Sequence, residues 1–126
     1  MYHVDVLCKE DSVFNVKAGT AGITIDMSEK NLSPLHALLG AFGSCVGVFV
    51  RKYADNLKLP IKEFSVCVES DLVKENPMGF RYISVSIDLK GVELDDTKRE
   101  GLMRFIGNCP VGNTLRGNPE INVVLK

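Results

Sequence analysis

The stretch LHALLGAFGSCVGVFV, from Leu35 to Val50, decides the fold of this chain. Ser33 and Pro34 precede it and are typical of a helix start, because a serine hydroxyl caps free N–H groups and proline fits the first helical position. The pattern predicts one helix from about residue 34 to residue 56. Its first two-thirds are apolar almost all round, so we expect this part of the helix to be buried on every side.

The same stretch is too short to cross a membrane, since about 16 apolar residues fall below the roughly 20 that a spanning helix needs. One small domain has difficulty enclosing a helix that is apolar on all sides, so we expect a second copy of the chain to cover part of it. Gly40, Gly43 and Gly47 lower the helix propensity, and they allow another backbone to approach closely.

Composition indicates a soluble globular protein, with 45% hydrophobic and 25% charged residues, and we expect residues 1–126 to form a single domain. A net charge of −1 offers no electrostatic footprint for nucleic acid or an acidic membrane. The N-terminus does not resemble a signal peptide, so the four cysteines are expected in a reducing cytoplasm, where paired thiols more often perform redox chemistry than form structural disulfides.

Alternating apolar and polar residues predict strands on both sides of the helix. The expected strands cover residues 2–8, 14–18, 23–27, 64–69, 83–89 and 121–125. A second helix is expected from Asp95 or Asp96, and a short third helix from Pro110 to Leu115. The buried stripe of the second helix is expected to contain Leu102, Met103, Phe105 and Ile106. The order βββ-α-ββ-α-α-β is typical of the α+β class.

Two cysteines stand at positions that favour chemistry. Cys109 directly precedes Pro110 and would therefore be the N-cap of the third helix, where free N–H groups lower a thiol pKa. Cys45 lies within the apolar helix, where burial by itself raises the thiol pKa. Each cysteine has a structural alternative, because a small thiol also fills space in a core.

Few other side chains could assist these thiols. His36 lies nine residues before Cys45, which places it on the opposite side of the helix and about 13 Å away along the axis. It could reach a thiol only across the fold or from a partner subunit, and it could equally be structural. The strand lysines Lys9, Lys17 and Lys30 are candidate cations. Solvated charges are expected at Arg51 and Lys52, and packing roles at Cys8 and Cys67. No CxxC pair is present, so a metal site is not expected.

The segments SPLHALLGAFGSC, residues 33–45, and NCPVGNTL, residues 108–115, together resemble the OsmC/Ohr family of peroxide-reducing proteins. The resemblance covers the whole chain and implies an OsmC-like α+β fold, built as an intertwined homodimer with active sites at the subunit interface. It implies that Cys45 attacks the peroxide and becomes a sulfenic acid, and that Cys109 resolves it to a disulfide. A small dithiol or dithiol protein would then reduce the disulfide, without a cofactor.

An apolar surround that includes Phe42 and Phe49 would favour organic hydroperoxides as substrates. The chain departs from the family pattern in two places, however. Peroxidase members carry a glutamate soon after the proline of the first motif, where this chain has Leu35 and His36. They also carry a thiolate-activating arginine in the N-terminal strand region, whereas the first arginine here is Arg51.

His36 is therefore the candidate base or thiolate stabiliser. Two other functions remain open. One is a non-catalytic OsmC-like domain that binds an apolar small ligand, and the other is a thiol sensor of oxidants.

Overall fold

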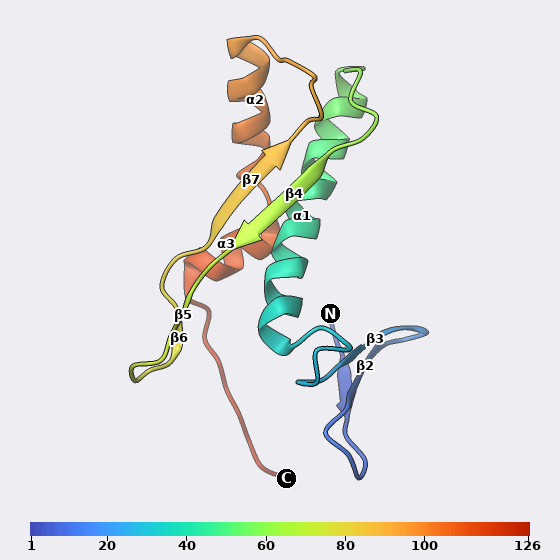
Figure 1. Ribbon diagram of the computed structural model, residues 1–126, viewed down its shortest axis with the longest axis vertical. Helices are drawn as coiled ribbons and strands as arrows, with labels where there is room; N and C mark the ends of the chain where they lie inside the picture. The colour runs from blue at the N-terminus through green and yellow to red at the C-terminus, as the bar shows by residue number, and fades with distance from the viewer. The chain divides into compact units, whose positions relative to one another are not determined.

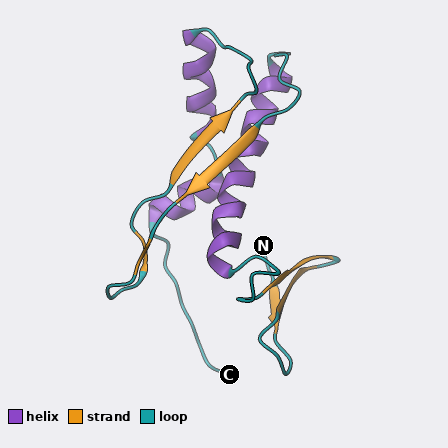
Figure 2. Ribbon diagram, viewed as in Figure 1, coloured by secondary structure: helices purple, strands orange, loops and turns teal.

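The computed structural model describes residues 1–126, which form two compact units, Met1–Gly40 and Ala41–Lys126. In the first unit, strands β1 (Asp5–Leu7), β2 (Phe14–Ala18) and β3 (Ala21–Ile25) form an antiparallel sheet in that order (Figure 2). Most residues of these strands are exposed within the chain. The expected meander is confirmed, and the expected half-buried face is wrong, because a strand face is buried only where another layer covers it.

A tight loop joins β3 to the long helix, and a buried carboxylate holds it together. Asp26 is only 6% exposed. One of its oxygens accepts hydrogen bonds from the backbone N–H and the hydroxyl of Ser28, and the other accepts from the side-chain amide of Asn31. These hydrogen bonds, that from Asn31 first, hold the pKa of Asp26 below its ordinary value.

Helix α1 (Pro34–Asn56) has the predicted bounds, and the Ser33 hydroxyl accepts the N–H of His36 as the expected cap does. Its buried positions follow one stripe, and they are Phe42, Gly43, Val46, Val50 and Ala54. Val48, on another face, is 49% exposed. The helix is thus buried on one face by its own chain, and the expectation of burial on every side is wrong for the single chain.

In the second unit, a two-stranded antiparallel sheet lies along α1 (Figure 1). Its strands are β4 (Ser65–Glu69) and β7 (Ser84–Asp88), and the short pair β5 (Leu72–Val73) and β6 (Gly79–Phe80), which the pattern did not predict, extends the hairpin. A Cβ at Gly43 would lie 2.9 Å from Val68, so this glycine permits close approach of the sheet of the same chain.

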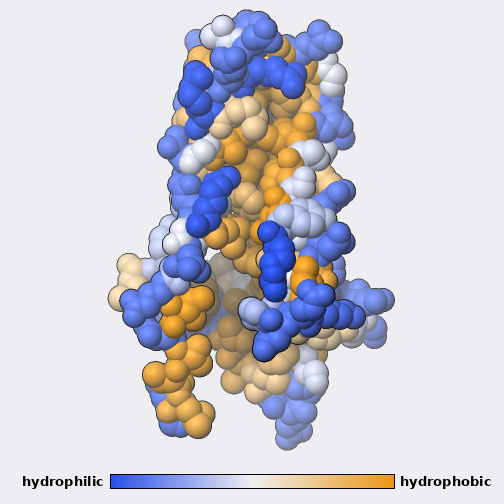
Figure 3. Space-filling model, turned by 90° about the vertical axis from the view of Figure 1, so that its left-hand side faces the viewer, coloured by the Kyte–Doolittle hydropathy of each residue, from blue (hydrophilic) through white to orange (hydrophobic).

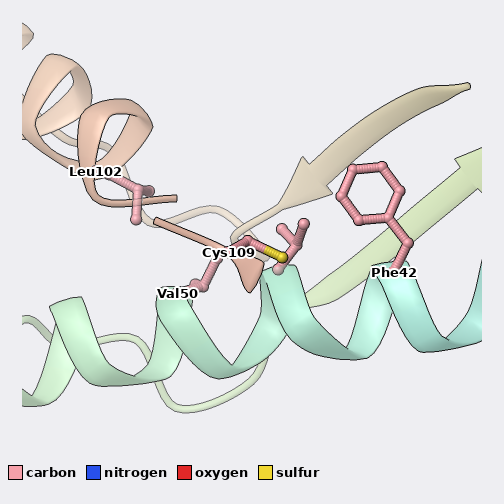
Figure 4. Packing of buried hydrophobic residues seen from close by; sticks show 5 residues of the cluster. Phe42, Val50, Leu102 and Cys109 are labelled. Atoms are coloured by element: carbon pink, nitrogen blue, oxygen red, sulfur yellow. The ribbon is translucent and has the colours of Figure 1, made fainter. Parts of the chain in front are cut away.

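Two further helices complete the second unit, α2 (Asp96–Ile106) and α3 (Pro110–Gly117). The Asp95 side chain caps α2 by accepting from the N–H of Lys98. Leu102 is buried as expected, whereas Met103 is 62% exposed, so its assignment to the buried stripe is wrong. The core cluster joins α1, α2 and the α2–α3 junction through Phe42, Val46, Val50, Leu102 and Cys109 (Figure 4).

The last strand expected from the pattern, at residues 121–125, does not form within the chain. Residues 118–126 have no strand partner, and Ile121, Val123, Val124 and Leu125 are 79–101% exposed. Alternation alone does not make a strand, because a strand is stabilised by pairing with a neighbour. The α+β class itself is confirmed by the rest of the molecule.

At 23 residues, helix α1 is longer than its 16-residue apolar stretch, and it is long and apolar enough to cross a membrane by length and composition alone. The expectation that it is too short is therefore wrong by this test. A core helix of a soluble protein passes the same test, and this helix packs into the core along its buried stripe.

Candidate active site

Cys109 occupies the N-cap of α3, as the Cys-Pro sequence predicted. Pro110 stands in the first turn of the helix, and the free N–H of Gly112 donates to the Cys109 sulfur at 3.5 Å. The Cys109 N–H donates in turn to the carbonyl oxygen of Ile106, the last residue of α2. Cys109 is 1% exposed, and Figure 4 shows its side chain over α1, between Phe42 and Val50.

Cys45 lies on α1 next to this helix start and is half-buried. A hydrogen bond joins its side chain to that of Cys109, and the backbone N–H of Val111 donates to its sulfur. Val111 and Gly112 are successive residues in the first turn of α3, where N–H groups have no partner within the helix. The two free thiols therefore share one helix start, and each accepts a different N–H group.

Burial raises the pKa of the Cys45 thiol above its ordinary value, and the hydrogen bond with Cys109 raises it further. Two features lower it, the N–H of Val111 and the positive charge of Lys52. The site thus contains both the influences that keep Cys45 protonated and those that would stabilise its thiolate.

The two phenylalanines named as pocket residues lie on α1 on either side of Cys45 in sequence. Phe42 is buried, and its ring edge would lie 3.0 Å from a Cβ at Gly112, so it packs against α3. Phe49 is half-buried and meets the ring of Phe105, on α2, edge to face with centroids 5.4 Å apart. Apolar rings therefore flank the half-buried thiol.

His36 lies in the first turn of α1, where its Nδ1 is 2.6 Å from the Ser33 hydroxyl. Its backbone N–H donates to the same hydroxyl, which binds it to the helix cap. His36 and Cys45 share α1, whose rise separates their backbones by about 13 Å, so nothing on this helix brings them into contact. A role for His36 in reactivity stays a prediction.

Two contributors to the site were missed by sequence reasoning. The N–H of Val111 was missed because only Cys109 was expected to face the start of α3. Lys52 was treated as a solvated charge, although the i, i+7 spacing from Cys45 places both on one face of a helix. Spacing alone would have found the second of these.

Arg51, beside it, is not simply solvated. Its guanidinium donates to the carbonyl oxygens of Ile61 at 2.7 Å and Lys62 at 3.0 Å. It also lies 5.1 Å from the ring centroid of Phe64. Arg51 therefore holds the segment before β4 against α1.

The other two cysteines lie apart from this pair. Cys8 and Cys67 are exposed, so their assignment as buried packing residues is wrong within the single chain. The Cys67 sulfur donates toward Glu69 at 3.5 Å, and this hydrogen bond to a carboxylate raises the pKa of Cys67.

Comparison with known families decides the relationship that the two cysteine motifs suggested. The family model described as OsmC-like protein matches residues 27–124, most of the chain including both cysteines. This chain belongs to the OsmC-like family. The family is soluble.

Solved structures of OsmC-like proteins have the same fold. An OsmC-like protein from Mycoplasma pneumoniae is similar with a TM-score of 0.77 and 22% sequence identity, over 93% of this chain and 88% of that chain. An organic hydroperoxide resistance protein from Legionella pneumophila is similar with a TM-score of 0.64 and 17% identity, over 94% and 90%. One from Elizabethkingia anophelis has a TM-score of 0.65 and 14% identity, over 94% and 91%.

At these identities the similarity establishes an OsmC-like fold, and the chemistry must be argued from the residues of this chain. No protein of curated function matches the chain in sequence.

Proposed function

We propose that this OsmC-like protein is a cysteine-based thiol peroxidase that reduces organic hydroperoxides. The observation that carries the proposal is the hydrogen-bonded pair of Cys45 and Cys109 at the start of α3. A pair of thiols in contact supplies both the nucleophile and the resolving group of a peroxide reduction. Membership of a family with relatives named organic hydroperoxide resistance proteins supports the same reading.

The reaction balances in three steps. The Cys45 thiolate attacks the terminal, hydrogen-bearing oxygen of ROOH, so that the O–O bond breaks, Cys45 becomes a sulfenic acid, and the alkoxide leaves as the alcohol ROH after proton uptake. The Cys109 thiol then attacks the sulfenic sulfur, forming the disulfide and releasing water. A dithiol finally reduces the disulfide by two thiol exchanges and is itself oxidised to a disulfide.

The surroundings of Cys45 favour an apolar R group. Phe42 and Phe49 flank the thiol, so an organic hydroperoxide gains contacts here that hydrogen peroxide does not. Within the pair, the half-buried Cys45 is the thiol that a substrate reaches, and the buried Cys109 is the resolving thiol that attacks the sulfenic acid.

The proposal includes a homodimer. Figure 3 shows hydrophobic residues gathered in a band along one face of the second unit, where a partner would cover them. Val48 on α1 and the segment 121–125 support the same idea, because both are well exposed within the chain and the segment pairs with no strand. A cytoplasmic location fits a site that a dithiol must keep reduced.

The direct test is consumption of cumene hydroperoxide with dithiothreitol as the reductant. We expect the wild-type protein to consume it faster than hydrogen peroxide and Cys45→Ser to abolish consumption. We expect Cys109→Ser to slow it, because dithiothreitol must then reduce the half-buried Cys45 sulfenic acid directly. Cys67→Ser is the matched control, since Cys67 is a free thiol outside the pair, and it should keep wild-type turnover. Consumption that survives Cys45→Ser would overturn the assignment.

Mass spectrometry gives an independent prediction about the pair. After mild peroxide treatment, we expect an intramolecular disulfide between Cys45 and Cys109, with Cys8 and Cys67 still reduced. Cys45 that stays reduced under these conditions, or that pairs with Cys67, would contradict the mechanism.

One observation favours a second candidate function. Burial raises the pKa of Cys45, which disfavours the nucleophilic thiolate. A protein that binds cumene hydroperoxide or another apolar ligand between Phe42 and Phe49, and leaves it unchanged, would be a binding domain of the same fold.

A further inference from the structure

Peroxidase members of the family have a thiolate-activating arginine in the N-terminal strands, and this chain has no arginine there. The family pattern therefore does not identify a cation that could stabilise the Cys45 thiolate. The structure offers two adjacent cations on α1, Arg51 and Lys52. Arg51 already has partners, since its guanidinium donates to two carbonyl oxygens and lies 3.9 Å from the carboxylate of Asp55. Lys52 pairs with no carboxylate of the chain, whose ion pairs involve His3, Arg51, Lys90 and Lys98.

Helix geometry places Lys52 on the side of α1 that carries the thiol. Cys45, Phe49 and Lys52 are spaced by four and three residues, so they lie along one face within about 60° of one another. The Lys52 ammonium lies 5.3 Å from the centroid of the Phe49 ring. Long side chains on a helix point back toward its N-terminus, which for Lys52 is the direction of Cys45.

We propose that Lys52 is the positive charge that stabilises the Cys45 thiolate, and that the Phe49 ring holds its ammonium in place. The inference rests on the proposed function, since peroxide attack needs that thiolate. It assigns to a lysine of the central helix the electrostatic task that an arginine performs in peroxidase members of the family. Phe49 thereby has two roles, as an apolar wall for the substrate and as a cation–π support.

The titratable groups facing Cys45 are few, which makes the effect of Lys52 measurable. Cys109 faces it from the α2–α3 junction, and Lys52 from its own helix. The residues of α2 that pack in this region, Phe105 and Ile106, are apolar. The charge of Lys52 lowers the pKa of Cys45, against the burial that raises it.

The experiment measures alkylation of Cys45 by iodoacetamide across pH, resolved at this residue by peptide mass spectrometry. We expect Lys52→Met to slow alkylation near pH 7 about threefold, which equals an upward shift of the pH profile by about half a pKa unit. Lys52→Arg should restore the wild-type profile, because it keeps the charge. Lys62→Met removes a charge elsewhere and should leave the profile unchanged.

Salt provides a readout that a structural role would not give. Lys52 is exposed, so its effect on Cys45 should shrink in about 0.5 M salt, where the Debye length falls to a few ångströms. An unchanged profile in Lys52→Met would overturn the inference, as would an equal loss in Lys52→Met and Lys52→Arg.

Cumene hydroperoxide consumption, measured in parallel, separates this inference from the proposed function. A wild-type protein that consumes no peroxide while its alkylation profile depends on Lys52 would overturn only the peroxidase. If the wild-type protein consumes the peroxide and its alkylation profile is the same as that of Lys52→Met, only the role of the lysine is overturned.

Discussion

Burial acts to raise the pKa of both Asp26 and Cys45, but their net pKa shifts are opposite because their hydrogen bonds differ. Asp26 is buried but accepts hydrogen bonds from Ser28 and Asn31, which favour the charged carboxylate and lower its pKa. Cys45 accepts a hydrogen bond from one N–H group but is also hydrogen-bonded to the Cys109 thiol, and burial together with this second hydrogen bond raises its pKa. At the residue scale, the partners of a buried group therefore decide whether it is charged.

Asp26 yields a prediction about acid stability. The pKa of Asp26 is lower in the folded protein than in the unfolded chain, where it is about 4. The contribution of Asp26 to the free energy of unfolding is therefore present above about pH 4 and is lost as the pH falls through the pKa of the folded protein. Between about pH 5 and pH 3, we expect the urea-unfolding free energy of Asp26→Asn to depend less on pH than that of the wild type. Asp11→Asn, at an exposed turn, is the control. An Asp26→Asn variant that keeps the full wild-type slope would contradict this role.

At the scale of elements, the packing of α2 on α1 determines where Cys109 lies, because α2 leads directly into the junction that carries it. The Tyr53 hydroxyl, on α1, donates to the carbonyl oxygen of Lys98 on α2 at 2.9 Å. Gly101 makes room for it, since a Cβ there would clash with that hydroxyl. A glycine inside a helix is destabilising by roughly 1 kcal/mol relative to alanine, so its presence here is explained by this contact.

The contact predicts a substitution whose effect changes sign with its neighbour. Gly101→Ala should lower the free energy of unfolding by about 1–2 kcal/mol, because overpacking outweighs the gain in helix propensity. In a Tyr53→Phe background, where the hydroxyl is absent, the same substitution should raise it by about 0.5–1 kcal/mol. A double-mutant cycle by urea denaturation measures both values. The same sign in the two backgrounds would mean that the hydroxyl does not set the helix spacing.

At the scale of the whole molecule, apolar surface is more extensive than a single chain of this size covers. Leu38 and Val48 on α1 remain well exposed, and the apolar residues of segment 121–125 contact no strand. Monomeric soluble proteins rarely expose large contiguous apolar patches. A second copy that covers α1 and pairs with the C-terminal segment would remove both features.

We therefore expect a homodimer in light scattering at micromolar concentration, with an interface above about 2,000 Å² in total. Val48→Glu should shift the distribution toward monomer, because it places a charge on the face of α1 that we expect to be covered. Leu57→Glu is a matched control, since Leu57 is 48% exposed against 49% for Val48 but lies beyond the end of α1. A monodisperse wild-type monomer would contradict the dimer.

The sequence alone determined the features that depend on neighbours in the chain. Ser33 and Pro34 predicted the start of α1, and Cys109 with Pro110 predicted an N-cap thiol, because capping involves only the first turn of a helix. The pairing of Cys45 with Cys109 was implied by the family resemblance and could not be derived from either motif.

Only the tertiary structure decided which groups surround Cys45. The Val111 N–H approaches its sulfur because α3 packs on α1, and the Arg51 guanidinium donates to the carbonyl oxygen of Ile61, in the segment before β4. The segment 121–125 has the alternation of a strand and yet forms none within the chain. The contact of Val111 with Cys45 joins residues far apart in sequence, and a strand needs a partner strand, so local patterns carry no information about either feature.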